Sequence, residues 1–430
     1  MAKRSGSADL PLHGGRVPAW LGERMTRLGT VMAEAIIHHE GRDAFLARLA
    51  HPFWFQSFGA VMGMDWHSSG ITTSVIGALK RGLNPRSGEL GLRVCGGRGR
   101  HSRATPAELA AAGEQAGFDG GELARASRLV AKVDSAALQD GFDLYLHGFF
   151  VTDDGKWAVV QQGMNGASKT ARRYHWLSEG LTSFVDSPHA AIEGRRQGEV
   201  LNLADRRAGA SRDAQLELLA ELGPDRLALE AAAVEMGTRE MGTRTFSRKS
   251  TCPQMAAAEP MLPHLALPDH HDVRPDDVIL RRLHGTLAAA AEAGPKDFAD
   301  LLLVPGVGAR TVRSLAMVAE VIHGAPSRFA DPARFSLAHG GKDRHPFPVP
   351  LKVYDRTIGV LKSAVEQAKL GQDEKLGAIR RLDEQARRLE AHVAGPSLEA
   401  VVEEERRLSH SYGGRSVFGL EPPVRDATAA

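Results

Sequence analysis

Residues 143–165 read DLYLHGFFVTDDGKWAVVQQGMN, and this stretch decides the expected fold class. Two runs rich in aromatic and β-branched residues flank Asp153, Asp154 and Gly155, a pattern typical of a β-hairpin. The segment ELGLRVCGG at 89–97 predicts another strand, whereas most of the remaining chain has apolar residues at helical spacing. We therefore expect an α+β protein, with an N-terminal mixed α/β domain that contains the hairpin and a C-terminal all-helical domain.

The composition along the chain predicts the boundaries of these domains. A chain of 430 residues is too long for a single compact core. Residues 250–277 contain five prolines and little periodicity, which is typical of a linker. We assign 1–250 to an α+β domain that carries the chemistry, 251–277 to the linker, 278–408 to a helical domain that binds DNA, and 409–430 to a loose tail.

Bulk properties exclude several classes of protein. The net charge is only +2, so an argument for nucleic acid has to come from local clusters. The two cysteines, Cys95 and Cys252, lie too far apart for a disulfide framework or a cysteine-rich zinc site. The amino terminus lacks the apolar core of a signal peptide, and no apolar run is long enough to span a membrane. We expect a cytoplasmic protein with no membrane contact.

The segment LLLVPGVGARTVR at 301–313 carries the strongest functional signal. Its glycines permit a tight turn, and a helix expected to begin near Ala309 would expose free N–H groups that bind anions. The segment resembles the helix-hairpin-helix motif of DNA-repair proteins, which implies contact with the DNA backbone without base reading. The expected DNA contacts are Gly306, Gly308, Arg310, Thr311 and Arg313. The alternative is an ordinary turn between two helices.

The same motif occurs in base-excision glycosylases, where a catalytic aspartate follows the hairpin. Here HPFPVPLKVYDRTI at 345–358 puts Pro350 in that position, and Arg310 replaces the lysine of the bifunctional enzymes. Asp343 or Asp355 would have to supply the carboxylate. Residues 310–356, which include Lys342, contain eight Lys and Arg against four acids, and this excess also favours DNA.

A second polar cluster, GMDWHSSGITT at 63–73, lies between apolar flanks. Asp65 and His67 combine a carboxylate with an imidazole, which suits either a divalent metal such as Mg or Mn or general-base chemistry. The structural alternative is a capped helix start.

The segment CGGRGRHSRATP at 95–106 follows the expected strand with glycines and three arginines, Arg98, Arg100 and Arg103. Backbone N–H groups and guanidinium groups in such a loop suit phosphate binding. The alternative is a solvated basic loop. Thr105, Pro106 and Glu108 match a capping box, so we expect a helix to begin at Thr105.

The hairpin supplies the last candidates. Asp143 and His147 are four residues apart, an even spacing that predicts one shared face of the first strand. A carboxylate there, with Gln161 and Gln162 on the second strand, weakly resembles restriction-type nuclease cores. Arg172 and Arg173 precede Tyr174 and Trp176, which suits phosphate contact and base stacking. Use of these aromatic residues in the core is the alternative.

The segments ADLPLHGGRVPAWL, GMDWHSSGITT, WAVVQQGMN, ARRYHW, VPGVGARTV and AHGGKDRHPFPV together resemble an uncharacterised bacterial and archaeal family, number seven hundred and sixty-three among the domains of unknown function. The resemblance covers most of residues 5–370 and implies no established activity.

These observations favour a DNA-processing or repair enzyme, in which the helical domain binds the duplex backbone and the α+β domain hydrolyses a phosphodiester. Asp65, His67, Asp143, His147 and Asp343 are the expected catalytic residues, and Asp65 and His67 the expected metal ligands. A base-excision glycosylase, a DNA-binding adaptor and a small-molecule enzyme stay open as alternatives. DNA is the expected partner, which would associate the protein with the nucleoid.

Overall fold

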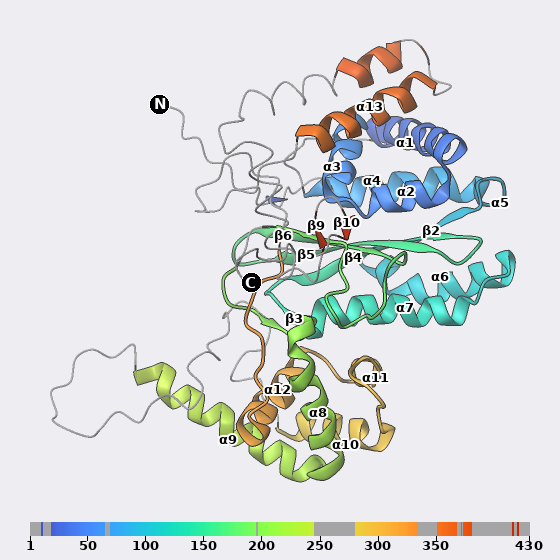
Figure 1. Cartoon of the computed structure of the whole chain (residues 1–430). Coiled ribbons are helices and arrows are strands. Elements are labelled where there is room, and N and C mark those ends of the chain that lie inside the picture. Colours follow the sequence, from blue (N-terminus) through green and yellow to red (C-terminus); the bar gives the residue numbers. More distant parts are fainter. Residues whose placement is uncertain are drawn as a thin grey trace, which may run out of the picture.

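The computed structural model describes residues 10–11, 19–64, 69–194, 197–244, 280–333, 351–367, 371, 373–380, 415–416 and 419–420. The α+β class is confirmed: an antiparallel sheet lies between two layers of helices, with further helices below them (Figure 1). The helices are α1 (Ala19–Glu40), α2 (Arg42–Leu49), α3 (Pro52–Val61), α4 (Gly70–Leu83), α5 (Ser87–Leu90), α6 (Arg100–Ala116), α7 (Gly120–Lys132), α8 (Gly209–Glu221), α9 (Gly223–Arg244), α10 (Leu280–Ala293), α11 (Phe298–Leu303), α12 (Ala309–His323) and α13 (Leu351–Gln367). Short helical turns are η1 (Asn84–Arg86), η2 (Val133–Ala137, a π-helix) and η3 (Arg206–Ala208).

The main sheet has the strand order β1-β6-β5-β4-β2, with β7 also paired to β6. The strands are β1 (Leu10–Pro11), β2 (Leu92–Arg98), β4 (Asp143–Thr152), β5 (Trp157–Asn165), β6 (Thr170–Leu177) and β7 (Ala191–Glu193). Two small sheets pair β3 (Leu138–Gln139) with β8 (Leu201–Asn202) and β9 (Arg415–Ser416) with β10 (Gly419–Leu420). The expected hairpin is confirmed, since β4 and β5 pair from Val151↔Trp157 to Asp143↔Met164.

Both faces of the sheet are buried, which explains why its central strands are apolar without strict alternation. Leu146, Phe150 and Val160 pack into a cluster with α1–α4 and α13. Phe149 and Val159 pack on the other face, in a cluster with α6 and α7. The two helical layers therefore hold the sheet rigidly and fix the positions of residues at the strand ends.

Five helices, α8–α12, form a helical unit below the sheet. Their buried residues, among them Leu218, Leu287 and Val312, belong to the same cluster as Phe149 and Val159 of the sheet. The helical unit therefore shares a continuous core with one face of the sheet. The segment boundaries expected from composition stay predictions.

The expected start of a helix at Thr105 is wrong, because α6 begins at Arg100. The Thr105 hydroxyl donates to the Ser102 carbonyl at 2.8 Å, and this bond replaces the donor that Pro106 lacks. The Glu108 carboxylate accepts from the Gly96 N–H at 2.8 Å and pairs with Lys80 instead of capping the helix.

Candidate nucleic-acid interface

The segment 304–308 forms the tight turn that its sequence predicts. The Val307 N–H donates to the Val304 carbonyl at 3.1 Å, and Gly306 has a φ of 89°. A type II turn requires a positive φ at its third position and commonly has proline at its second. Val304 and Val307 are buried on either side of the exposed tip, so the turn is anchored in the core.

Helix α12 begins at Ala309, as expected, directly after this turn. Gly308 is its N-cap residue and has no side chain to cap the first amides. The φ of Gly308 is −147°, which any residue adopts, and a Cβ added there would meet nothing within 4 Å. The fold therefore does not require glycine at 308, but glycine leaves the backbone open to a ligand.

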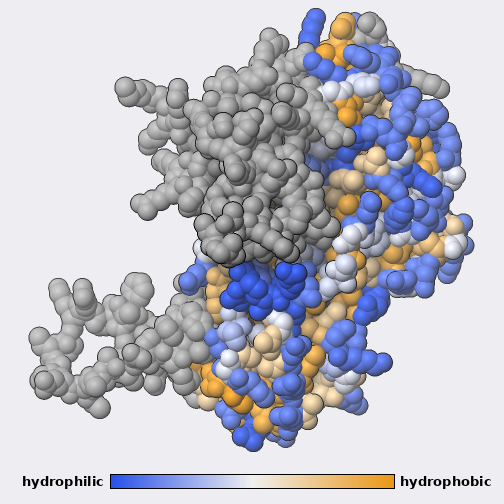
Figure 2. Space-filling view, viewed as in Figure 1, coloured by the Kyte–Doolittle hydropathy of each residue, from blue (hydrophilic) through white to orange (hydrophobic). Residues whose placement is uncertain are grey.

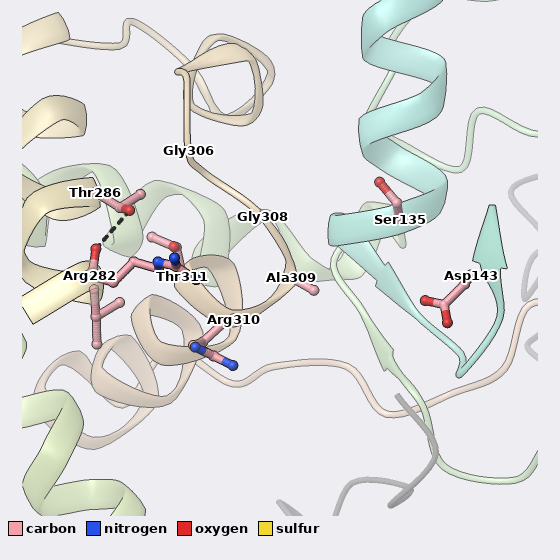
Figure 3. A pocket seen from close by; sticks show the side chains of 10 residues that line it. Ser135, Asp143, Arg282, Thr286, Gly306, Gly308, Ala309, Arg310 and Thr311 are labelled. Atoms are coloured by element: carbon pink, nitrogen blue, oxygen red, sulfur yellow. Dashed lines mark hydrogen bonds between the residues drawn. The ribbon is translucent and has the colours of Figure 1, made fainter. Parts of the chain in front are cut away.

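A pocket of about 320 Å³ opens at the start of α12. We call it the hairpin pocket (Figure 3). Arg310 and Thr311 of α12 line it together with the exposed Arg282 of α10, which forms no ion pair with any described residue. The other wall carries Ser135 of η2 and Asp143 of β4. Its lining residues are Ser135, Asp143, Arg282, Leu283, Thr286, Gly306, Gly308, Ala309, Arg310 and Thr311.

Contacts from Lys132 of α7 and Gln139 of β3 fix the turn at 304–308 and the start of α12 against the sheet. The Lys132 ammonium donates to the Val307 carbonyl, and the Gln139 amide donates to the Ala309 carbonyl at 2.7 Å. Burial lowers the pKa of Lys132. The Arg125 guanidinium of α7 also pairs with Asp300 of α11 at 2.8 Å. The two walls of the hairpin pocket are therefore held at a set separation.

A second basic surface lies at the same end of the sheet. Arg98, Arg100 and Arg103 are all exposed, with Arg98 at the end of β2 and the other two on the first turn of α6. We call these three residues the basic turn. The Arg98 guanidinium lies over the Tyr145 ring at 5.7 Å. Tyr145 lies two residues along β4 from Asp143 of the hairpin pocket, a rise of about 7 Å along the strand. Figure 2 shows hydrophilic residues gathered where the helical unit meets the sheet.

The prediction that Arg172 and Arg173 contact DNA is wrong, because both side chains are fully buried. Arg173 pairs with Glu193 at 2.7 Å. Arg172 of β6 bridges Asp140, at 2.9 Å, and Asp331, at 2.6 Å. A guanidinium inside the core cannot reach a phosphate, so these residues join parts of the fold. The neighbouring Tyr174 and Trp176 are core residues as well.

The expected pairing of Asp143 with His147 on one face is also wrong. The β4–β5 register shifts between Leu144 and Leu146, and this bulge interrupts the two-residue alternation. Asp143 lies exposed in the hairpin pocket. His147 is buried, its two ring nitrogens lie 3.0 Å from the Ser127 hydroxyl and 2.6 Å from Gln161 Oε1, and burial lowers its pKa. His147 is therefore not placed to act on an external substrate.

Four expected site residues, Asp65, His67, Lys342 and Asp343, lie outside the described residues, as does Pro350. The residues that follow Asp65 and His67 are well anchored: the Ser69 carbonyl accepts from the Gln162 amide at 3.0 Å, and that amide also donates to the Tyr145 hydroxyl at 2.6 Å. Ser69 is therefore linked through Gln162 to Tyr145, whose ring lies under Arg98 of the basic turn. Within the described ranges, no three His, Cys, Asp or Glu side chains are grouped to hold a metal ion, so the expected metal site stays a prediction.

Sequence reasoning missed four residues of the site: Lys132, Ser135, Gln139 and Arg282. Lys132 and Gln139 contact the hairpin across 175 and 170 residues of sequence. Arg282 is one of several basic residues on a helix, and no local pattern distinguishes it. Only the docking of α7 and α10 against the hairpin gives these side chains a role.

Comparison with known proteins assigns no activity. The model of one family, described as Protein of unknown function (DUF763), matches residues 6–349. No curated protein and no solved structure matches the chain. Among the described residues, no helix is long and apolar enough to cross a membrane.

Proposed function

Because the chain belongs to the DUF763 family, whose description names no activity, we propose a function from the site itself: the protein binds DNA through backbone phosphates at the hairpin pocket. The observation that supports this most is the pocket at the uncapped start of α12, which Arg282 and Arg310 both line. Free N–H groups at a helix start favour negative charge, and guanidinium groups bind phosphate oxygens in pairs.

The open space beside Gly308 supports the same proposal. Gly306 is explained by the turn alone, because its φ is positive. Gly308 has no such structural requirement, yet it lines the pocket and leaves its backbone accessible. A phosphate oxygen that approaches the α12 amides would pass next to this position. Because such contacts do not involve base edges, binding would be independent of sequence.

Salt-dependent DNA binding tests this proposal. We expect Arg282→Gln and Arg310→Gln each to weaken duplex binding about tenfold and to reduce the salt slope by about one, as for the loss of one phosphate contact. The matched control is Arg226→Gln, because Arg226 is an exposed arginine of the same helical unit outside the pocket. If both pocket variants bind like the control in fluorescence anisotropy, the hairpin pocket does not hold DNA.

The basic turn favours a second step, in which the bound DNA is cut. Arg98, Arg100 and Arg103 lie at the same end of the sheet as the hairpin pocket, and Arg98 lies over Tyr145, which shares the Gln162 amide with the Ser69 carbonyl. We propose that the protein is a DNA-processing enzyme in which Asp65 and His67 hold a Mg or Mn ion. Water would attack phosphorus and lose a proton to solvent, the P–O bond to one sugar would break, and the released sugar oxygen would take up a proton, which leaves one phosphate end and one hydroxyl end. The basic turn would stabilise the charge on the phosphate.

Cleavage assays test this second step separately. Nicked, flapped and damaged duplexes are incubated with the protein and either Mg or Mn, and the products are separated on a denaturing gel. We expect cleavage that is lost in Asp65→Asn and reduced in Arg100→Gln/Arg103→Gln. Arg128→Gln, an exposed position on α7, serves as the control. If no substrate is cut with either metal, the nuclease proposal is wrong, although DNA binding can still hold.

A further inference from the structure

The hairpin pocket lies between two walls, which restricts the size of the group it can hold. One wall is the hairpin with α10 and α12, and the other consists of Ser135 and Asp143 (Figure 3). Lys132 and Gln139 donate to the carbonyls of Val307 and Ala309, and these bonds hold the two walls together. Because the two walls are held at a fixed separation, the pocket admits only a group of limited size.

The size of the pocket agrees with this restriction. Its volume of about 320 Å³ lies at the lower limit of small-ligand pockets, which span about 300–1,000 Å³. A site of this size takes one nucleotide-sized group. An extended strand would instead require a longer groove, as found in proteins that follow a single strand.

The pocket offers several donors to a phosphate. Arg282 and the first amides of α12 lie on one side. Thr311 adds a hydroxyl that lines the pocket, is only 5% exposed as a residue, and hydrogen-bonds to no described residue. A phosphomonoester carries a charge of about −1.5 to −2 and three acceptor oxygens, whereas a diester carries one charge. The monoester matches this donor set better.

The opposite wall gives the bound group a direction. The Asp143 carboxylate repels phosphate but accepts hydrogen bonds from a sugar hydroxyl or from the amino group of a base. The phosphate would therefore lie on the side of the α12 start, with the sugar and base toward Asp143. We infer that the hairpin pocket binds the phosphorylated end of a DNA strand. This inference rests on the proposed DNA binding and specifies which part of the DNA the pocket recognises.

Binding to duplexes that differ only at one strand end tests the inference. The probes are a sealed duplex and three duplexes with a one-nucleotide gap, which carry a 5′-phosphate, a 3′-phosphate or hydroxyl ends. We expect one of the phosphorylated gaps to bind about tenfold more tightly than the hydroxyl gap, since it adds charge-assisted hydrogen bonds. Arg282→Gln and Thr311→Val should each reduce this preference, and Arg226→Gln should leave it unchanged.

The outcomes separate this inference from the proposed function. A preference for either the 5′- or the 3′-phosphate supports the inference and identifies the end. Equal affinity for phosphorylated, hydroxyl and sealed duplexes, still weakened by Arg310→Gln, overturns the inference and leaves backbone binding intact. Failure to bind any of the four probes overturns both. Circular dichroism of each variant shows whether the fold is intact, and Arg282→Lys, which keeps the charge, should retain part of the preference.

Discussion

Arg172 is the residue whose replacement tests the buried connection between the sheet and the helical unit. Its guanidinium lies 2.9 Å from Asp140 and 2.6 Å from Asp331, and all three side chains are essentially unexposed. Asp331 follows α12, so the pair with Arg172 joins the helical unit to β6. Arg172→Met keeps an apolar stem beside Phe142, whose ring lies 4.8 Å from the guanidinium, but leaves two carboxylates buried without their cation.

The loss of unfolding free energy expected for Arg172→Met follows from the burial of its two partners. Removing one partner of a buried ion pair costs about 3–5 kcal/mol, because the remaining charge is desolvated and unpaired. Burial already raises the pKa of Asp140 to about 6, even though Arg172 acts to lower it. Without Arg172 that pKa rises further. A carboxyl with a raised folded-state pKa stabilises the fold below its unfolded value and loses this contribution as pH rises. The variant should therefore be most destabilised at alkaline pH.

Equilibrium urea unfolding, followed by tryptophan fluorescence at about pH 8 and about pH 5, measures both effects. We expect a loss of about 3–5 kcal/mol at the higher pH and a smaller loss at the lower pH. Arg125→Met is the matched control: it also breaks a contact between the helical unit and the sheet layers, but its pair with Asp300 is exposed and should cost less than about 1 kcal/mol. If Arg172→Met costs no more than this control at about pH 8, the reasoning is refuted.

Four further predictions concern the turn at 304–308 and the same buried network. Gly306→Ala should cost about 1–2 kcal/mol in unfolding free energy, because alanine is strained at a φ of 89°. Gly308→Val should cost no more than about 1 kcal/mol, since valine is a poorer N-cap residue than glycine but the space beside Gly308 is open in the free protein. It should lower duplex affinity in anisotropy assays; an unchanged affinity would argue against phosphate approach there. Lys132→Met should leave the Val307 carbonyl without its donor and cost about 1–3 kcal/mol, with Arg128→Met, an exposed change on α7, as a neutral control in urea unfolding. For Asp140→Asn, the unfolding free energy should rise relative to the natural protein between about pH 4 and pH 7, by on the order of 3 kcal/mol, because only the natural side chain loses its stabilising proton in that range; parallel pH profiles of the two proteins would contradict this.

The local features of this protein were predictable from short stretches of sequence. The aromatic and β-branched runs around Asp153–Gly155 predicted the β4–β5 hairpin, and Pro305 with Gly306 predicted the turn before α12. These predictions succeed because strand propensity, turn type and positive φ depend on neighbouring residues. The exposure of the arginines at 98, 100 and 103 also agrees with the polar, glycine-rich sequence around them.

The failed predictions of site residues concern how one segment of the chain pairs with or packs on another. Arg172 and Arg173 belong to a cationic and aromatic run that suits nucleic acid, but long-range pairing buries them: Arg172 meets Asp331 across 159 residues. The spacing of Asp143 and His147 gives no sign of the bulge that separates them. Whether a charged side chain is exposed depends on which elements cover its strand, and no local pattern contains that information.

The sequence by itself determined the α+β class, the hairpin strands and the turn at 304–308, because backbone preferences of adjacent residues specify each of them. Only the tertiary structure decided that Arg282, Arg310 and Asp143 line one pocket, that Lys132 and Gln139 fix its walls, and that Arg172 is a buried connector. The physical reason is that a binding site requires charges to converge in space, and convergence is set by the packing of α7, α10 and α12 against the sheet.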